Sequence, residues 1–240
     1  MAAARHEAPE SVSGWERVPA DAAYSHVRNN VTRLLADRPA AGDLTVAACP
    51  EWTVRDVVAH LVGICAAVAV KLGGRSAAEP LPGSDAALAD LLDAWAVAGE
   101  QAERLIAGAR RGGVMTMDAF THELDIRHAL GVPPPAGHPA YPGALDVVVG
   151  GFSAEVSRRG LPALSIETAG ARWAAGGEGR PAVTLEAGRY DLYRSLAGRR
   201  THAQIARLRW SEDPRPWLPA FAWGPFEPPV RQAESAADAW

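Results

Sequence analysis

Three side chains able to bind a metal ion occur at informative positions in this sequence. Asp118 and His122 lie four residues apart, so on a helix their side chains share one face, one turn apart. Two metal ligands on a single helix require this spacing. His60 lies in a second apolar, helix-like stretch, Thr53–Leu72, and can supply a third ligand. Two histidines and a carboxylate are a ligand set of catalytic zinc sites, which leave one position open for water or substrate.

Each of these three residues also has a simpler explanation. His60 is flanked by apolar residues and can be a buried histidine that is only hydrogen-bonded, and His122 is no more informative alone. Asp118 can be a solvated charge or a partner of Arg110 or Arg111. Taken together, the three match the way in which helical bundles hold metals between facing helices. The spacing alone leaves the metal site and the purely structural explanation both open.

Further candidates surround the pair on the same stretch. Asp125 follows His122 by three residues and can either orient that histidine or pair on the surface with Arg127. Glu123 is adjacent to His122 and therefore points about 100° away around the helix. His128 comes six residues after His122, which is too far around the helix to share the site easily.

Two cysteines and an arginine pair complete the set of reactive or ligand-binding candidates. Cys49 and Cys65 have no basic neighbour in sequence to activate them, and a buried cysteine ordinarily acts as a small apolar residue. Arg199 and Arg200 follow a short predicted helix and can bind a ligand carboxylate through forked hydrogen bonds, or simply be solvated.

The composition narrows the class of protein. Hydrophobic residues make up 48% of the 240 residues, which is enough to fill a core. The formal net charge of -4 lacks the basic excess of a nucleic-acid-binding protein. The sequence shows neither a signal-peptide pattern nor an apolar run long enough to span a bilayer. With only two cysteines, we expect a cytoplasmic protein without a disulfide framework.

The hydrophobic pattern predicts helices in the first half and a small sheet in the second. Helical periodicity predicts an antiparallel four-helix bundle and a fifth helix, from the ranges Ala20–Ala36, Thr53–Leu72, Ala86–Ala107, Val114–Leu130 and Pro142–Arg159. Thr53 and Asp56 form a helix-start pattern, and 40–52 is expected to be a loop.

After Leu161 the pattern alternates, as in half-buried strands. Strands are predicted at 163–168, 172–173, 182–186 and 202–210, with short helices at 190–197 and 217–222. The fold class is therefore α+β. We expect a flexible tail over residues 1–16, a helical bundle over 17–159 and a small α+β domain over 160–240.

Three segments resemble one known family. The segment Cys49–Leu61, CPEWTVRDVVAHL, resembles the second-helix signature of the mycothiol-dependent maleylpyruvate isomerase family, whose bundle belongs to the DinB-like superfamily of metal-binding four-helix proteins. Asp118–Gly131 is similar to the family's fourth-helix motif. Asp191–Trp210 resembles the motif of its C-terminal domain, which is related to sterol-carrier proteins. The similarity covers roughly residues 20–228.

The resemblance implies a function. It implies a divalent metal ion, usually zinc, on His60, Asp118 and His122, although the family usually has glutamate where this chain has the shorter aspartate. It further implies an isomerase or thiol transferase in which the thiolate of mycothiol adds to a small electrophilic acid, with Arg199 and Arg200 holding carboxylates. The alternative is a non-catalytic metal- or ligand-binding module of the same fold.

Overall fold

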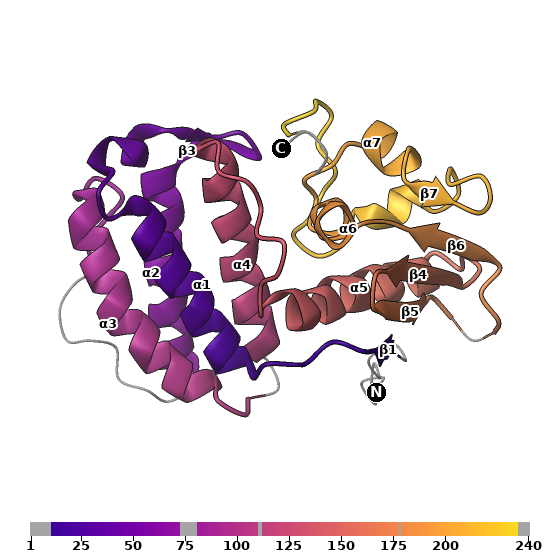
Figure 1. Ribbon diagram of the computed structural model, residues 1–240, viewed down its shortest axis with the longest axis horizontal. Helices are drawn as coiled ribbons and strands as arrows, with labels where there is room; N and C mark the ends of the chain where they lie inside the picture. The colour runs from indigo at the N-terminus through magenta and orange to yellow at the C-terminus, as the bar shows by residue number, and fades with distance from the viewer. Residues whose placement is uncertain (1–10, 73–80, 110–111, 178, 235–240) are drawn as a thin grey trace. The chain divides into compact units, whose positions relative to one another are not determined.

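The chain forms two compact units. The computed structural model describes residues 11–72, 81–109, 112–177 and 179–234 (Figure 1). The helical unit comprises residues 17–144, and the sheet unit joins the described part of residues 1–16 to that of residues 145–240. Together they have the predicted α+β fold class, a four-helix bundle followed by a small α+β domain.

Four helices make up the bundle of the helical unit. They are α1 (Ala20–Leu35), α2 (Val54–Lys71), α3 (Leu88–Ile106) and α4 (Gly112–Ala129). Helix α1 packs against α3 and α4, and α2 packs against the same two helices (Figure 1). Helix α4 is buried around most of its circumference, since polar as well as apolar residues of its second half are inaccessible to solvent. Polar side chains of α4 are therefore held inside the bundle.

Helix α2 begins where the sequence predicts. Thr53 Oγ1 accepts a hydrogen bond from the Asp56 backbone N–H, and the Asp56 carboxylate accepts one from the Thr53 N–H at 2.8 Å. This reciprocal capping satisfies two donors that a helix start otherwise leaves without partners. The buried stripe of α2, which includes Val57, Val58 and Leu61, then faces the other helices.

A small hairpin precedes α2 where the sequence predicts only a loop. It consists of β2 (Thr45–Val46) and β3 (Cys49–Thr53), paired antiparallel, and follows the short 3-10 helix η1 (Pro39–Asp43). The strands are too short for alternation of polar and apolar residues to be recognised. The hairpin fixes the position of Trp52, immediately before the first turn of α2.

The sheet unit is built on a five-stranded sheet in the order β1-β5-β4-β6-β7. Its strands are β1 (Ser11–Ser13), β4 (Leu164–Thr168), β5 (Ala171–Ala175), β6 (Val183–Glu186) and β7 (Arg209–Trp210). Strands β4 and β6 pair in parallel, and every other pair is antiparallel.

Helix α5 (Tyr141–Arg158) begins in the helical unit and contributes most of its length to the sheet unit. Trp173 Nε1 on β5 donates to the Asp146 carboxylate at 2.8 Å, and the Gly176 N–H donates to Ser153 Oγ at 2.9 Å. The units therefore divide after Ala144, whereas the sequence pattern places the boundary near residue 160.

The predicted strand over 202–210 is wrong for most of its length. Residues His202–Ala206 form helix α7, and only Arg209–Trp210 are in a strand. The Thr201 hydroxyl accepts from the Gln204 N–H while the Gln204 side chain accepts from the Thr201 N–H, so a second capping box starts this helix. The remaining helices are α6 (Arg189–Leu196) and the 3-10 helix η2 (Leu218–Phe221), both close to prediction.

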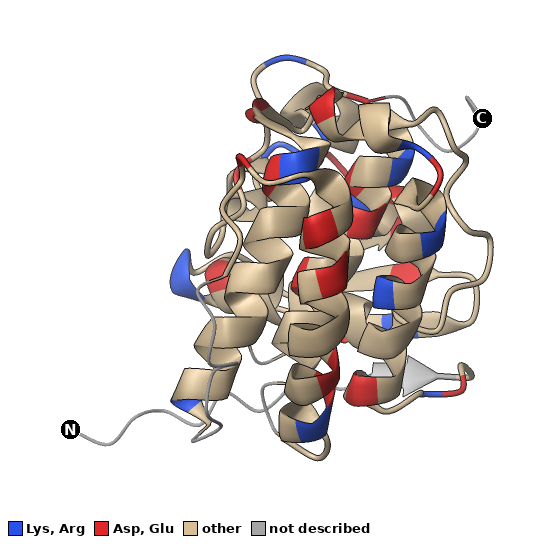
Figure 2. Ribbon diagram, turned by 90° about the vertical axis from the view of Figure 1, so that its left-hand side faces the viewer, with Lys and Arg blue, Asp and Glu red and all other residues tan. Residues whose placement is uncertain are grey.

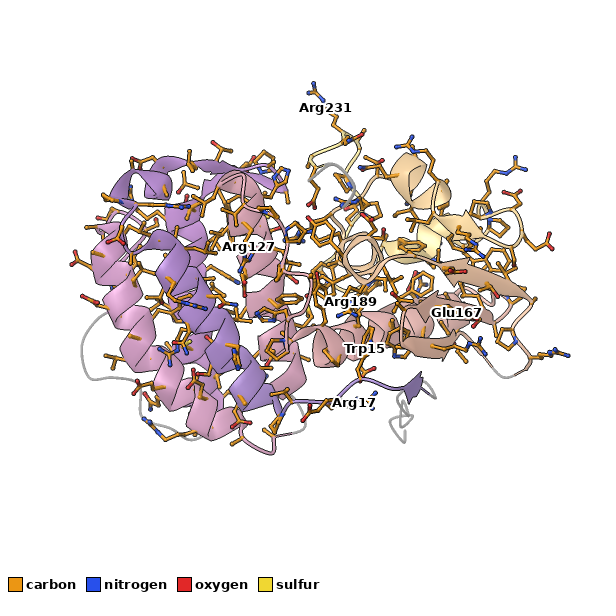
Figure 3. All side chains as sticks on the ribbon, in the orientation of Figure 1. Trp15, Arg17, Arg127, Glu167, Arg189 and Arg231 are labelled. Carbon is orange, nitrogen blue, oxygen red and sulfur yellow. The ribbon has the colours of Figure 1, made fainter. Side chains whose placement is uncertain are left out.

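The described part of the N-terminal segment is tied to the sheet. Strand β1 pairs with β5, and Trp15 Nε1 donates to the Ala169 carbonyl at 3.1 Å. The Arg189 guanidinium lies over the Trp15 ring, 5.0 Å from its centroid (Figure 3). Residues 11–16 thus differ from the flexible tail expected for 1–16, and residues 1–10 lie outside the described part of the chain.

The surface of the helical unit carries both signs of charge. In the ribbon of Figure 2, positions of acidic residues (red) recur along the helices of the bundle, with positions of basic residues (blue) among them. Among the described residues, no helix has both the length and the apolar character needed to cross a membrane.

Candidate metal site

The three predicted ligands meet between α2 and α4. His60 Nε2 lies 3.3 Å from one Asp118 carboxylate oxygen, and His122 Nε2 lies 3.9 Å from the other. One donor atom from each residue falls within 4.8 Å of the other two. The spacing of four residues on α4 and the packing of α2 against it therefore produce the convergence that the sequence predicts.

The geometry suits a small divalent cation. Two ligands at about 2.1 Å from a tetrahedral ion lie roughly 3.4 Å apart, so the His60–Asp118 pair is already at that separation. The His122–Asp118 pair is wider by a few tenths of an ångström, a difference within reach of a side-chain rotation. The His60 and Asp118 side chains are 27% and 31% exposed, which leaves one side of the site open to a ligand. The donor set of two imidazoles and one carboxylate fits zinc or a similar ion.

Asp125 holds His122 from the side opposite the candidate site. Its carboxylate lies 3.1 Å from His122 Nδ1, and the Asp125 side chain is completely buried. A proton on Nδ1 leaves the lone pair of Nε2 directed towards Asp118, as metal-binding histidines require. The alternative of a surface pair with Arg127 is wrong, because the Arg127 guanidinium instead binds Glu123 at 2.8 Å.

Trp52 forms an aromatic wall against both histidines. Its ring centroid lies 5.3 Å from that of His60 and 6.0 Å from that of His122, with the latter pair nearly parallel. The hairpin β2–β3 carries this residue, which explains why spacing along the helices did not single it out. The one indication of Trp52 in the sequence is its position in the segment 49–61, immediately before α2. The ring restricts the imidazole orientations and gives the open site an apolar boundary.

A buried polar network lies on the other side of α4. Glu123 is fully buried, and its carboxylate accepts from Asn30 on α1 at 3.2 Å and lies 3.2 Å from His138 Nε2. His138 Nδ1 accepts from the Ala140 N–H at 3.0 Å, and His138 Nε2 also lies 2.9 Å from the side-chain nitrogen of Asn30. Glu123 thus ties α4 to α1 and is directed away from the metal candidates, as its position beside His122 predicts.

The cysteines have different environments. Cys65 is buried in the bundle, where its sulfur lies 3.1 Å from the Tyr24 hydroxyl. Burial raises the pKa of the Cys65 thiol to about 11, so the thiolate is not accessible at neutral pH. Cys49 is partly exposed in β3. The expectation that Cys65 acts as a small apolar residue agrees with this environment.

Arg199 and Arg200 are both buried in the sheet unit, where each has interaction partners. Arg200 binds Asp191 at 3.0 Å and Glu234 at 3.2 Å. Arg199 donates to the Ala197 carbonyl at 2.9 Å and lies against the Phe226 ring. Their predicted role in binding a substrate carboxylate remains a prediction.

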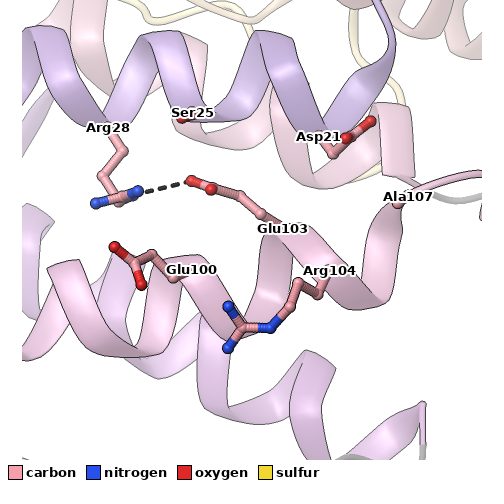
Figure 4. Close-up of a pocket in the computed structure, with 7 residues that line it drawn as sticks. All are labelled: Asp21, Ser25, Arg28, Glu100, Glu103, Arg104 and Ala107. Carbon is pink, nitrogen blue, oxygen red and sulfur yellow. Dashed lines mark hydrogen bonds and ion pairs between the residues drawn. The ribbon is translucent and has the colours of Figure 1, made fainter.

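A separate polar pocket of about 600 Å³ lies along α1 and α3 (Figure 4). Its charged lining is mixed in sign, with Arg28 bound to Glu103 at 2.9 Å and with Glu100, Arg104 and Asp21 around them. None of the three metal candidates lines it.

Comparisons with known proteins agree with this architecture. The chain resembles the crystal structure of the mycothiol-dependent maleylpyruvate isomerase, with a TM-score of 0.54 and 11% identity over 82% of this chain and 94% of that one. It also resembles the structure of a histidine-to-alanine mutant of that isomerase, with a TM-score of 0.52 and 12% identity over 81% of this chain and 90% of that one. These identities establish a shared fold alone. No curated protein sequence matches the chain.

The bundle itself matches a family model. The match covers residues 24–149, just over half of the chain, and is described as the mycothiol maleylpyruvate isomerase N-terminal domain. It includes α2 and α4, and with them all three metal candidates. The chain therefore belongs to the mycothiol maleylpyruvate isomerase N-terminal domain family.

Proposed function

We propose that this chain is a metal-dependent isomerase or thiol transferase that uses mycothiol and acts on a small electrophilic acid. The convergence of His60 Nε2, the Asp118 carboxylate and His122 Nε2 carries the proposal. Membership of the family and the shared fold with the mycothiol-dependent maleylpyruvate isomerase support it. A divalent cation held by these three residues, with zinc fitting the donor set, would stabilise a thiolate at neutral pH.

The residues of the chain prepare the site for such a reaction. His60 and His122 each direct Nε2 inward, and Asp118 supplies the negative charge that balances a cation. Asp125 holds the Nδ1 proton of His122 and fixes the ring. Trp52 borders the open side and offers an apolar surface to a substrate. Arg199 and Arg200 complete the proposal as candidate carboxylate-binding residues.

Metal analysis tests the site. Purified wild-type protein should bind about one equivalent of zinc, measured by inductively coupled plasma mass spectrometry after dialysis, and His122→Ala should lose it. His26→Ala is the matched control, because His26 is an exposed histidine of α1. Absence of bound metal in the wild type after zinc addition would contradict the proposal. It would leave a structural bundle in which His60 and Asp118 are only hydrogen-bonded.

Turnover separates the enzyme from the second candidate, a non-catalytic metal- or ligand-binding module. Asp118 favours this second candidate, because the shorter side chain leaves the His122 contact at 3.9 Å. Wild-type protein with mycothiol and maleylpyruvate should form the isomerised product, and His122→Ala should not. A wild-type protein that binds metal without turnover would establish the binding module instead.

A further inference from the structure

The pocket along α1 and α3 has charged residues on both of its walls (Figure 4). Asp21, Ser25 and Arg28 follow one another at intervals of four and three residues, so they share one face of α1. The wall from α3 has a similar spacing and consists of Glu100, Glu103, Arg104 and Ala107. The volume of about 600 Å³ lies within the range of roughly 300–1,000 Å³ that is usual for small-molecule sites. The two helices therefore form a polar pocket whose size suits a small ligand.

Arg28 is the most enclosed charged residue of this pocket. Its side chain is 10% exposed, and its Nε donates to Glu103 Oε1 at 2.9 Å. A Cβ at residue 99 would lie only 2.5 Å from Arg28 Cδ, so Gly99 provides the space in which the arginine side chain passes over α3. Arg28 and Glu103 neutralise each other inside the pocket. The charge offered to a ligand therefore comes from the other residues of the lining.

Three charged residues of the lining lack a partner of opposite charge. Within the described part of the chain, the side chains of Asp21, Glu100 and Arg104 make no hydrogen bond or ion pair. In Figure 4, Asp21 and Ala107 lie at one end of the pocket and Glu100 lies towards the other. Glu100 and Ala107 are seven residues apart, which is roughly 10 Å along a helix axis. The pocket thus presents two separated carboxylates and one guanidinium, an arrangement that favours an elongated ligand over a compact one.

We propose that this pocket binds a free basic α-amino acid of the lysine type. Such a ligand carries two ammonium groups and one carboxylate, which complement the two carboxylates and the guanidinium that lack partners in the pocket. Asp21 and Glu100 accept hydrogen bonds from the ammonium groups, and Arg104 donates two parallel hydrogen bonds to the ligand carboxylate. The proposal goes beyond the metal-dependent function and stands without it, because none of the metal candidates lines this pocket.

Isothermal titration calorimetry of the wild-type protein tests the class of ligand with three probes at equal ionic strength. L-Lysine carries all three charged groups, cadaverine lacks the carboxylate, and norleucine lacks the side-chain ammonium. L-Lysine should bind with a Kd below about 1 mM, and the other two should bind at least about tenfold more weakly, because each lacks one charge-assisted interaction. Absence of binding by L-lysine, or an affinity for cadaverine or norleucine within about tenfold of that for L-lysine, would overturn the proposal.

Variants of exposed residues test the location of the site. Glu100→Gln and Arg104→Gln each remove one charge of the lining and should weaken L-lysine binding by at least about tenfold. Asp93→Asn and Arg38→Gln are the matched controls, because both residues are exposed in the same unit and lie outside the pocket, and they should bind L-lysine as the wild type does. L-Lysine affinity that is unchanged in both pocket variants would place the binding elsewhere and overturn the proposal.

Discussion

His122 uses both of its ring nitrogens. Nδ1 faces the buried Asp125 carboxylate at 3.1 Å, while Nε2 faces Asp118 across the candidate site. The orientation of the ring is therefore set before any ligand arrives, and a preorganised ligand loses less conformational freedom on binding. The identity of residue 125 should therefore affect metal affinity without contributing a ligand atom.

Asp125→Asn should weaken zinc affinity by about 10- to 100-fold, because the amide lacks the negative charge with which the Asp125 carboxylate holds the His122 ring in place. Competition with a fluorescent zinc chelator measures the change. Asp93→Asn removes an exposed acid from α3 and serves as the control. Equal affinities for wild type and Asp125→Asn would show that the contact does not tune the site.

Cys65 belongs to a buried hydrogen-bonded chain with Tyr24 and Trp95. The Trp95 indole donates to the Tyr24 hydroxyl at 2.8 Å, and that hydroxyl lies 3.1 Å from the Cys65 sulfur. Burial raises the pKa of Cys65 from 9.0 to about 11. The unfolded chain therefore releases this proton at lower pH than the folded protein does. The stabilisation is complete below pH 9 and is lost as pH rises towards 11.

The free energy of unfolding of the wild type should fall between pH 9 and pH 11, with Cys65 accounting for up to about 3 kcal/mol. Cys65→Ala should show a shallower decline over the same range, whatever its stability at pH 8. Urea unfolding at pH 8, 9, 10 and 11 measures both slopes. If the free energy of unfolding fell equally steeply with pH in both proteins, the Cys65 thiol would have no role in the loss of stability at alkaline pH.

The metal candidates were predictable because their geometry is local. Asp118 and His122 share a helix face by spacing, and His60 lies on a second apolar helix. Spacing could not identify Trp52 or Glu234. A hairpin places Trp52 beside His60, and Glu234 lies 40 residues along the chain from its partner Arg194. Pairwise sequence spacing carries no information about such contacts.

At the scale of elements, two of the three glycines of α5, Gly143 and Gly151, have contrasting environments. A Cβ at Gly143 would meet nothing within 4 Å. A Cβ at Gly151 would come within 2.0 Å of the Trp223 ring, which is anchored by a 2.9 Å hydrogen bond from its indole nitrogen to the Leu196 carbonyl. The same substitution should therefore have opposite effects at two positions of one helix.

Gly143→Ala should stabilise the protein by about 0.5–1 kcal/mol, because alanine restricts the unfolded chain more than glycine does. Gly151→Ala should destabilise it by about 1–3 kcal/mol, because the Trp223 ring must move. Urea unfolding of the two variants measures the difference. Stabilisation by both substitutions would mean that Trp223 does not pack against α5.

Helix starts were predicted best where side chains cap the backbone. The pair Thr53 and Asp56 predicts the start of α2, whereas the strand predicted over 202–210 does not account for the equivalent pair Thr201 and Gln204. Over a few residues, one apolar residue between polar ones is compatible with both the helical period of 3.6 residues and the strand period of two residues. A short helix is therefore predicted as a strand unless its capping residues are considered. The cap was the decisive information in the sequence.

For the whole molecule, the change of hydrophobic period after Leu161 predicted the α+β class, and the periodicity within each half predicted most of its elements. The division between the units was not predictable, since α5 shows a single helical pattern on both sides of Ala144. Contacts such as those of Asp146 and Ser153 tie the rest of the helix to the sheet unit. Such contacts join residues more than 20 positions apart, so they produce no periodic pattern in the sequence.

The net charge gives a prediction for the intact protein. With a formal charge of -4 and an isoelectric point near 6.0, the chain should not be retained on heparin at pH 7.5 in 50 mM sodium chloride. A basic protein of similar size, retained on the same column, is the control. Elution only above 200 mM salt would reveal a basic surface that the overall charge conceals.

The position of Trp52 gives the protein an intrinsic optical reporter. Its indole lies 5.3 Å from the His60 ring and 6.0 Å from the His122 ring. Copper(II) or cobalt(II) held by those rings would quench its fluorescence, while zinc, with a filled d shell, would leave emission largely intact. The intensity of the tryptophan emission would therefore report the exchange of zinc for copper(II) or cobalt(II) in solution, without any added dye.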